Sequence, residues 1–259
     1  MRDIRIFCQT PIVADAPFEL PPSAAQHVVK VLRLREGQAL TLFDGSGGEW
    51  AATITALRKD RVSVTARRHD PVERESPLAI TLLQALARGE KMDWIVQKAT
   101  ELGVARLVPI ATLRSVVQLD GERADKRLAH WRSVAIAACE QSGRNRLPEI
   151  ATPVPLDAAC AIAATRGIGM YRYALAPGDA PDFASALRAL ELQQGATPPR
   201  LTLLVGPEGG LTDEELARAA DCGFSPVSLG PRVLRTETAG AAAIAVAQAL
   251  LGDLRKISA

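Results

Sequence analysis

The chain has 259 residues, of which 47% are hydrophobic and 23% charged, so it can bury a real core as one large or two modest domains. Its formal net charge is only +2, which excludes a uniformly basic surface, and any affinity for nucleic acid must come from local clusters. Aromatic residues are scarce at 4%, which argues against a surface built mainly from base-stacking platforms.

The four cysteines include no C-x-x-C pair, and the three histidines are dispersed along the chain. We therefore expect reduced thiols and no metal site. The most apolar stretch, Ala239–Leu251, is too short to cross a bilayer, and the residues after Met1 lack the apolar run of a signal peptide. The expectation is a cytoplasmic protein without a membrane segment.

Residues 1–72 are predicted to form a small β-rich domain with one helix, for which Ser23 is a plausible N-cap. The glycine-rich stretch 44–48 reads as a hairpin turn between two of its strands. Residues 70–77 are polar and bounded by proline, as in a linker. The predicted strands are Ile4–Cys8, Ala39–Phe43, Glu49–Leu57 and Val62–Ala66.

Residues 73–259 are predicted to form an α/β domain, because strands and helices alternate from here on. The strand candidates are Leu78–Ala85, Val104–Ile110, Leu201–Val205 and Pro226–Leu229. The helix candidates are Lys91–Leu102, Arg123–Glu140, a helix that begins with a capping box at Thr212, and Ala239–Leu251. This order favours a largely parallel sheet.

Two glycine-containing loops, Val205–Leu211 and Leu229–Thr238, each follow a strand and precede a helix. Such loops lie at the carboxyl edge of an open sheet, where ligands bind, and their glycines allow the backbone to approach a ligand closely. Neither loop carries a Walker or G-x-G-x-x-G pattern. An ordinary βα turn remains the alternative for the first loop, and a helix cap with a surface ion pair for the second.

The letters of these loops, LLVGPEGGLTDEE and LGPRVLRTETAGAAAI, closely resemble those of the SPOUT methyltransferases. More narrowly, the chain resembles the family that methylates N3 of a uridine in small-subunit (16S) ribosomal RNA. Further motifs match in the right order over nearly the whole chain. They are HVVKVLRLREGQALTLFDGSGGEW, EKMDWIVQKATELGVARLVPI, RSVV at Arg114–Val117, and ACEQSGRNRLPEI.

The resemblance implies a C-terminal domain knotted as a trefoil, an N-terminal PUA-like RNA-binding domain, and a homodimer. It also implies S-adenosylmethionine as cofactor, and 16S ribosomal RNA or the small ribosomal subunit as partner. The family carries an acidic residue at the end of a strand. The corresponding segment of this chain, Tyr173–Asp179, lacks an acidic residue at that strand end. A ribose 2′-O RNA methyltransferase and a non-catalytic RNA-binding ribosome assembly factor are the alternatives.

By this resemblance and the loop pattern, Arg235 is the candidate for electrostatic stabilisation of the uracil anion. Glu237 is the candidate for a general base or for orienting Arg235. The cofactor contacts are expected at Leu204, Gly206, Gly210, Leu229, Gly230, Leu234 and Thr238. The RNA contacts are expected at Lys30, Arg33, Arg35, Arg114, Arg144 and Arg146, with a solvated surface as the alternative for the other basic residues of the N-terminal domain.

Overall fold

The computed structural model describes residues 4–59, 61–115, 121–163, 170–192 and 199–254. It contains two compact units: residues 1–75 with 136–147, and residues 76–135 with 148–259. The predicted boundary lies between residues 72 and 73, and no local pattern indicates that residues 136–147 join the first unit.

The first unit is built on a five-stranded sheet with the order β1-β3-β4-β5-β2. Long antiparallel strands pair in its centre, and a parallel pair of β1 and β3 closes one side. The strands are β1 (Arg5–Phe7), β2 (Pro17–Glu19), β3 (Ala39–Phe43), β4 (Glu49–Arg58) and β5 (Arg61–Asp70). The predicted β-rich module is therefore present, with β2 as an additional edge strand.

One helical segment covers this sheet. It begins as α1 (Pro22–Gln26) and continues with π-type turns as η1 (His27–Val31). Ala25 and Val28 are buried from it, and they pack with alternate residues of the strands such as Ile54 and Val64. Pro21 and not Ser23 holds the N-cap position, so the predicted cap is displaced by two residues.

Residues 70–77 are tethered rather than free. Arg144, in the loop after α3 (Gly121–Ser142), forms a buried ion pair with Glu75, and Asn145 Nδ2 donates to the carbonyl oxygen of Val72 at 3.0 Å. Arg144 is 4% exposed and Asn145 is fully buried. Burial of charge and amide is tolerable here because each finds a partner, so residues 70–75 of the predicted linker are part of the first unit's packing.

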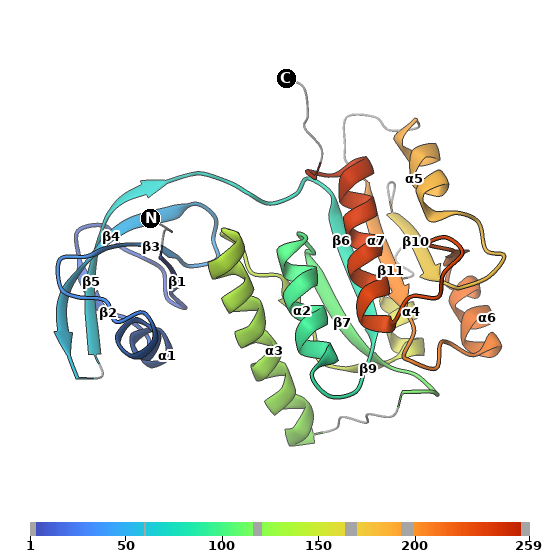
Figure 1. Cartoon of the computed structure of the whole chain (residues 1–259), viewed down its shortest axis with the longest axis horizontal. Coiled ribbons are helices and arrows are strands. Elements are labelled where there is room, and N and C mark those ends of the chain that lie inside the picture. The colour runs from blue at the N-terminus through green and yellow to red at the C-terminus, as the bar shows by residue number, and fades with distance from the viewer. Residues whose placement is uncertain (1–3, 60, 116–120, 164–169, 193–198, 255–259) are drawn as a thin grey trace. The chain divides into compact units, whose positions relative to one another are not determined.

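The second unit contains a parallel sheet with the strand order β12-β10-β11-β6-β7-β8, to which β9 adds beside β7 (Figure 1). The strands are β6 (Ala79–Ala85), β7 (Arg106–Ala111), β8 (Glu149–Ile150), β9 (Val154–Pro155), β10 (Met170–Leu175), β11 (Arg200–Val205) and β12 (Ser225–Val227). The parallel sheet confirms the predicted α/β class. Strand β10 was not among the predicted strands, although its Tyr171 and Tyr173 are typical strand residues.

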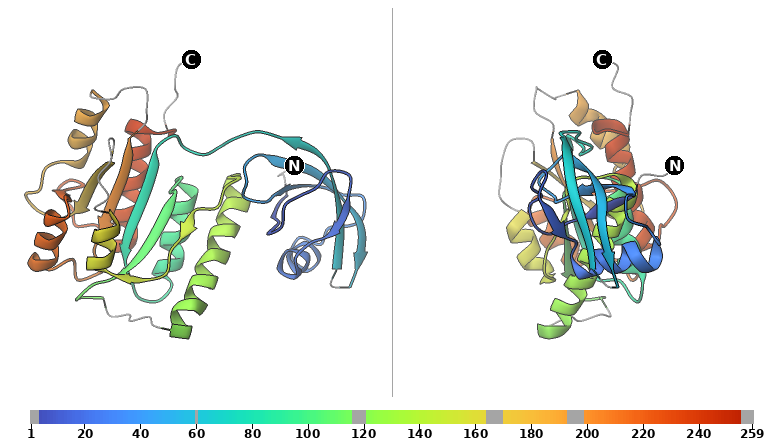
Figure 2. Two further views of the ribbon diagram at one scale, coloured as in Figure 1. Left: turned by 180° about the vertical axis from the view of Figure 1, so that it is seen from behind. Right: turned by 90° about the vertical axis from the view of Figure 1, so that its left-hand side faces the viewer.

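Helices cover both faces of this sheet (Figures 1 and 2). On one face α2 (Lys91–Glu101), α3, α5 (Phe183–Glu191) and α7 (Thr236–Leu251) bury their apolar sides. On the other face lie α4 (Leu156–Ala163) and α6 (Asp213–Asp221). Alternation along β11 divides its side chains between the layers: Leu203 and Val205 face the first, and Leu204 faces the second.

All strands of this sheet run in the same direction, so the loops that follow them meet at one edge. The neighbours β12, β10, β11 and β6 bring the segments after Val227, Leu175, Val205 and Ala85 to this edge. The two predicted glycine loops are therefore gathered at one place. The trefoil knot stays a prediction.

Candidate functional site

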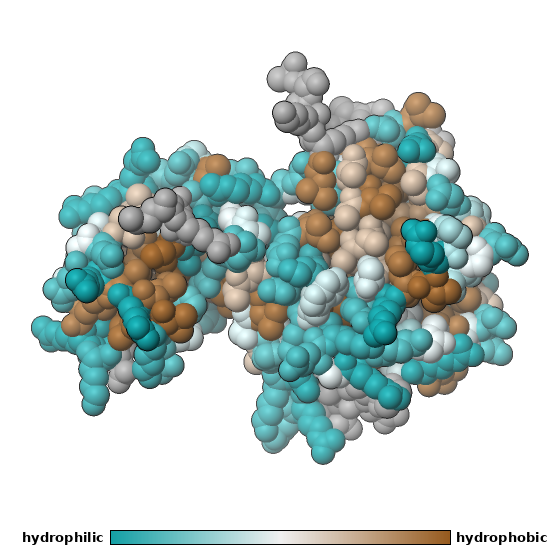
Figure 3. All heavy atoms as spheres, viewed as in Figure 1, coloured by the Kyte–Doolittle hydropathy of each residue, from teal (hydrophilic) through white to brown (hydrophobic). Residues whose placement is uncertain are grey.

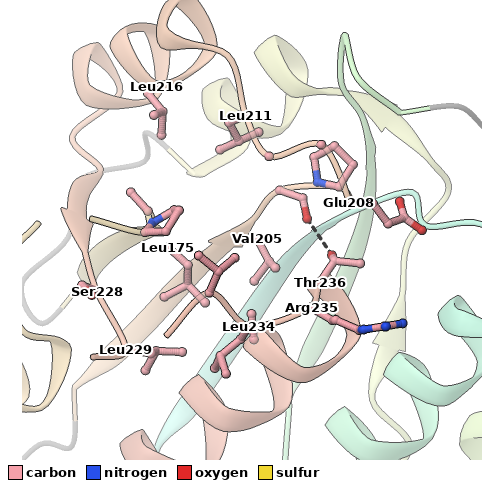
Figure 4. Close-up of a pocket in the computed structure, with 18 of the residues that line it drawn as sticks. Leu175, Val205, Glu208, Leu211, Leu216, Ser228, Leu229, Leu234, Arg235 and Thr236 are labelled. Carbon is pink, nitrogen blue, oxygen red and sulfur yellow. Dashed lines mark hydrogen bonds between the residues drawn. The ribbon is translucent and has the colours of Figure 1, made fainter. Parts of the chain in front are cut away.

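A cavity of about 680 Å³ lies at this edge of the second unit, lined by both glycine loops and by the end of β10 (Figure 4). Its volume is in the range of small-molecule and cofactor sites. The two loops thus form one composite pocket rather than two separate turns.

The first loop turns tightly between β11 and α6. Gly206 is closely packed, because a Cβ there would lie 3.0 Å from the backbone nitrogen of Leu211, a tight contact. Gly210 has a φ of +71°, in the left-handed region that favours glycine. The capping box of Thr212 and Glu215 then starts α6, as the sequence predicts.

The second loop leaves β12 at Ser228. The hydroxyl of Ser228 donates to the carbonyl oxygen of Gly230 at 3.1 Å, and Gly230 has a φ of +92°. The loop ends at α7, where Arg235 is the N-cap residue with extended dihedral angles, and its side chain makes no cap hydrogen bond. Helix α7 therefore begins at Thr236, three residues before the predicted start.

The two loops are joined directly at Thr236. Its hydroxyl donates to the carbonyl oxygen of Gly206 at 2.6 Å, drawn as the dashed line in Figure 4. The same hydroxyl accepts a hydrogen bond of 2.9 Å from Gln84 Nε2 at the end of β6. Thr236 is 5% exposed and Gln84 is fully buried, so this short chain of hydrogen bonds fixes α7 against the first loop inside the unit.

The pocket has an apolar end and a charged end. In Figure 4 the labelled leucine and valine side chains mark the apolar end, and Glu208 and Arg235 mark the charged end. The apolar lining comes from Leu175, Val205, Leu211, Leu216, Val227, Leu229 and Leu234. Such an arrangement suits a ligand with one flat apolar ring and one polar, charged part.

Lys91, at the start of α2, connects the acidic groups of the charged end. Its Nζ donates to Glu208 Oε1 at 2.9 Å and lies 3.6 Å from Glu237 Oε2. The hydrogen bond to Glu208 raises the pKa of Lys91. Partial burial opposes ionisation of Glu208, but the hydrogen bonds from Lys91 and from backbone amides, together with the Lys91 charge, outweigh it and hold the pKa of Glu208 below its ordinary value. Lys91 thus bridges a carboxylate of the first loop and one of α7.

A further segment, after β7, braces the first loop. Glu215, which is 1% exposed, accepts hydrogen bonds from the backbone nitrogens of Thr212 at 2.9 Å and Leu113 at 2.7 Å. Arg114 Nη1 donates to the carbonyl oxygen of Gly209 at 2.8 Å. The rest of the exposed Arg114 side chain remains at the mouth of the pocket, which it helps to line. Val116 and Val117 of the same motif lie outside the described residues.

The predicted cofactor residues Gly206, Gly210, Leu229, Gly230 and Leu234 all line the pocket. Two others do not. Leu204 is fully buried in the layer formed by α4 and α6, because it alternates with Val205, and Val205 lines the pocket in its place. Thr238 is exposed on the first turn of α7.

The predicted catalytic residues lie at the charged end, but not in the predicted relation. Arg235 lines the pocket and is exposed. Within the described part of the chain, no hydrogen bond or ion pair joins Arg235 to Glu237. The carboxylate of Glu237 instead lies beside Lys91. The structure therefore shows no direct contact by which Glu237 would orient Arg235, and both catalytic roles stay predictions.

The predicted RNA-contact residues separate into two groups. Lys30, Arg33 and Arg35 are exposed on the first unit and can reach a phosphate. Arg144 cannot, because it is buried against Glu75 and holds residues of its own unit together; the prediction of an RNA contact there is wrong. Arg146 is half exposed and paired with Glu73, Nε to Oε2 at 2.9 Å.

Reasoning from the residue pattern did not single out Lys91, and it placed a strand end at Tyr173–Asp179 only through the family resemblance. One signal was available for both: each segment directly follows or ends a strand of a parallel sheet, and the loops after such strands meet at one edge. At the end of β10, where the acidic residue is missing, the pocket is lined by Leu175, Ala176 and Pro177. This wall is apolar.

The pocket fits S-adenosylmethionine on its own geometry. The leucines of the apolar end suit an adenine ring, and the left-handed turns at Gly210 and Gly230 leave open space where a side chain would otherwise project. The backbone groups of both loops can bind the polar parts.

Among the described residues, no group of three or more His, Cys, Asp or Glu side chains is placed to hold a metal ion. No described helix is both long enough and apolar enough to span a membrane.

The sequence matches two family models in agreement with this site. Residues 74–248 match an RNA methyltransferase domain, and residues 20–66 match an RNA methyltransferase PUA domain. The fold and the site thus define an RNA methyltransferase.

Similar proteins narrow this class. The chain is 31% identical over 237 residues to ribosomal RNA small subunit methyltransferase E of Bacillus subtilis, covering 88% of each chain. It is 33% identical over 243 residues to the protein of the same name from Synechocystis, covering 92% of this chain and 75% of the relative. The chain belongs to the ribosomal RNA small subunit methyltransferase E family.

Two solved structures are similar over almost the whole chain. A putative methyltransferase of Legionella pneumophila, solved with bound S-adenosylmethionine, has a TM-score of 0.89 and 40% identity and covers 98% of this chain and 100% of its own. The small subunit methyltransferase E of Neisseria gonorrhoeae, bound to S-adenosyl methionine, has a TM-score of 0.85, 35% identity and the same coverage. These findings confirm the predicted SPOUT-class fold with its PUA-like domain, the predicted enzyme class and, at the level of the family, the predicted cofactor.

Proposed function

We propose that this protein transfers the methyl group of S-adenosylmethionine to N3 of a uridine in 16S ribosomal RNA of the small subunit. The observation that carries the proposal is the composite pocket, closed by the hydrogen bond from Thr236 to Gly206, in a chain of this family. The choice of N3 rests on the sequence resemblance. RNA binding is assigned to residues 1–72 and methyl transfer to residues 73–259.

Gly206, Gly210, Leu229, Gly230 and Leu234 are proposed to hold the cofactor, together with Val205 and the end of β10. When bound, S-adenosylmethionine supplies an electrophilic methyl group on a sulfonium. The loops then have to exclude water and aim that group at the charged end, where the target base must enter.

Uracil N3 is a poor nucleophile until it loses its proton, so the site must favour the anion. Arg235 is proposed to do this as a fixed positive charge beside the uracil carbonyl groups. It lines the pocket and, among the described residues, has no carboxylate partner in an ion pair. Glu237 is a poorer candidate for the general base, because the Lys91 ammonium lies beside its carboxylate.

RNA contacts are proposed for Lys30, Arg33 and Arg35 on the first unit and for Arg114 at the pocket mouth. Arg146 is also proposed to contact RNA, although its guanidinium is already ion-paired with Glu73. Arg144 is omitted. A local basic cluster can bind phosphate even though the whole chain has a net charge of only +2.

The protein is further proposed to act in the cytoplasm as a homodimer. Figure 3 shows apolar side chains gathered over α7 on the face of the second unit. Helix α7 has half-buried small residues on this surface, among them Ala241, Ala242 and Ala245, which allow close approach of another backbone. Such a surface is suited to packing against the same surface of a second copy of this chain.

The test uses ribosomal RNA from cells that lack the protein, offered either as assembled small subunits or as naked RNA. Purified protein and isotope-labelled S-adenosylmethionine are added, and the digested nucleosides are separated by mass spectrometry. Label in 3-methyluridine supports the proposal. Label on the ribose 2′ oxygen would show the alternative methyltransferase, and binding without any label would show the assembly factor.

A further inference from the structure

A third segment contributes to the charged end of the pocket besides the two glycine loops. Residues 86–90 connect β6 to α2, which begins at Lys91. Glu208 Oε1 accepts hydrogen bonds from the Arg88 backbone nitrogen at 3.2 Å and from Lys91 Nζ at 2.9 Å. Lys91 also lies within 3.6 Å of Glu237 at the start of α7. One ammonium therefore contacts a carboxylate from the first loop and another from the helix that ends the second loop.

The cluster has one cation for two carboxylates. Glu208 and Glu237 bring two negative charges, and Lys91 neutralises one of them while lying close to both. Glu237 Oε2 is buried and, within the described residues, accepts no hydrogen bond, and its ion-pair partner there is Lys91. An unpaired carboxylate in this position would be costly.

Arg235 stands two residues before Glu237 and lines the same end of the pocket. No ion pair to Arg235 occurs among the residues that the structure describes. If Lys91 were absent, both carboxylates would lack their cation, and the guanidinium of Arg235 would be attracted toward them. A negative field would also oppose the formation of an anion on the target base.

We propose that Lys91 is a positioning residue for methyl transfer, which offsets the negative charge of Glu208 and Glu237 and so leaves Arg235 available to the target base. The inference rests on the proposed function, because it assumes a base that becomes negative as it reacts. It assigns Glu237 the role of holding Lys91 rather than of accepting the proton. Lys91 itself touches neither the base nor the methyl group in this account.

The experiment compares Lys91→Met, Lys91→Arg and the double variant Lys91→Met/Glu237→Gln with the wild type. The matched control is Lys98→Met, since Lys98 is also on α2, is similarly half-buried, and is ion-paired with Glu101 at 2.9 Å. For each protein one measures kcat and KM with the RNA substrate, the Kd for S-adenosylmethionine by calorimetry, and the thermal unfolding midpoint.

Lys91→Met is expected to lower kcat by about tenfold or more while the Kd for S-adenosylmethionine changes by less than about threefold. Lys91→Arg should retain most of the rate, because the charge is kept. The double variant should regain part of the lost rate, since the uncompensated carboxylate of Glu237 is gone. Lys98→Met should leave kcat at the wild-type value.

An unchanged kcat in Lys91→Met, or a double variant that is no faster than the single one, would overturn the inference. Should the single variant not fold, the double variant decides alone: a kcat within about tenfold of the wild type supports the inference, and a deeper loss overturns it. A wild-type protein that puts no methyl group on uridine N3 refutes the proposed function instead, and the inference that rests on it.

Discussion

The hydroxyl of Thr236 donates a hydrogen bond of 2.6 Å to the carbonyl oxygen of Gly206, and this contact joins two loops that lie thirty residues apart in the chain. It makes the pocket a property of both loops together. Because Gln84 donates to the same hydroxyl, the strand β6 is part of this arrangement as well.

Replacing Thr236 by valine tests this connection. Valine keeps the shape but removes the hydroxyl, so the buried amide of Gln84 and the carbonyl of Gly206 each lose a partner. We expect a loss of about 1–3 kcal/mol in the free energy of unfolding and weaker binding of S-adenosylmethionine. Urea unfolding and calorimetry measure the two effects. Thr236→Ser, which keeps the hydroxyl, is the control and should retain both properties; equal losses in the two variants would speak against the hydrogen bond.

Arg235→Ala separates binding from catalysis. The side chain is exposed at the charged end, away from the leucines, so its loss should leave the affinity for S-adenosylmethionine within about threefold of the wild type. The rate of RNA methylation should fall about 10²–10³-fold, as when one preorganised donor is removed. Methylation at the normal rate in this variant would disprove the role given to Arg235.

The basic cluster of the first unit is tested by its salt dependence. Changing Lys30, Arg33 and Arg35 together to alanine should weaken binding of naked ribosomal RNA and make the slope of log affinity against log salt less negative by about 2. The matched control removes Arg58, Arg61 and Arg67 from the same unit, where Arg61 pairs with Glu19 and Arg67 with Asp15. If both triple variants bind RNA alike, the cluster at residues 30–35 has no special part in binding.

The pH dependence of stability should contain a contribution from Glu49 in the first unit. A hydrogen bond from Arg74, supported by another from Arg5, lowers the pKa of Glu49 from 4.5 to about 2. Since the folded-state pKa is depressed, the stabilisation is fully present above the unfolded value and is lost as the pH falls from about 4.5 toward 2. Its size is at most about 3 kcal/mol.

Glu49→Gln isolates this contribution from the other carboxylates. The difference in unfolding free energy between wild type and variant should be largest at about pH 6 and should shrink at about pH 3. Denaturant titrations at both values measure it. A difference that is the same at both would mean that the carboxylate charge of Glu49 contributes nothing.

The sequence could predict the positions of the two loops because glycine, proline and the capping box mark them, and because buried strands precede both. It could not show which side of the sheet each strand residue faces. Leu204 and Val205 belong to one continuous apolar run, and only the pairing of β11 with β6 and β10 decides that Val205 lines the pocket.

The ion pairs could not be predicted from the sequence for a different reason. Nothing in the amino-acid sequence around Arg144 distinguishes it from an exposed arginine. Its partner Glu75 lies about seventy residues earlier, and the two meet only in the folded unit. Lys91 and Glu208 are still farther apart in the chain. Long-range pairs of this kind follow from topology, not from local pattern.

The measurement that tests the composite pocket most directly is calorimetric titration with S-adenosylmethionine of the wild type and of Leu211→Asn and Leu234→Asn. Each variant makes one apolar contact polar, and the two come from opposite loops of the same cavity. We predict saturable binding by the wild type and clearly weaker binding by both variants while they remain folded. No binding by the wild type, or binding that is weakened by only one of the two substitutions, would contradict a single pocket formed by both loops.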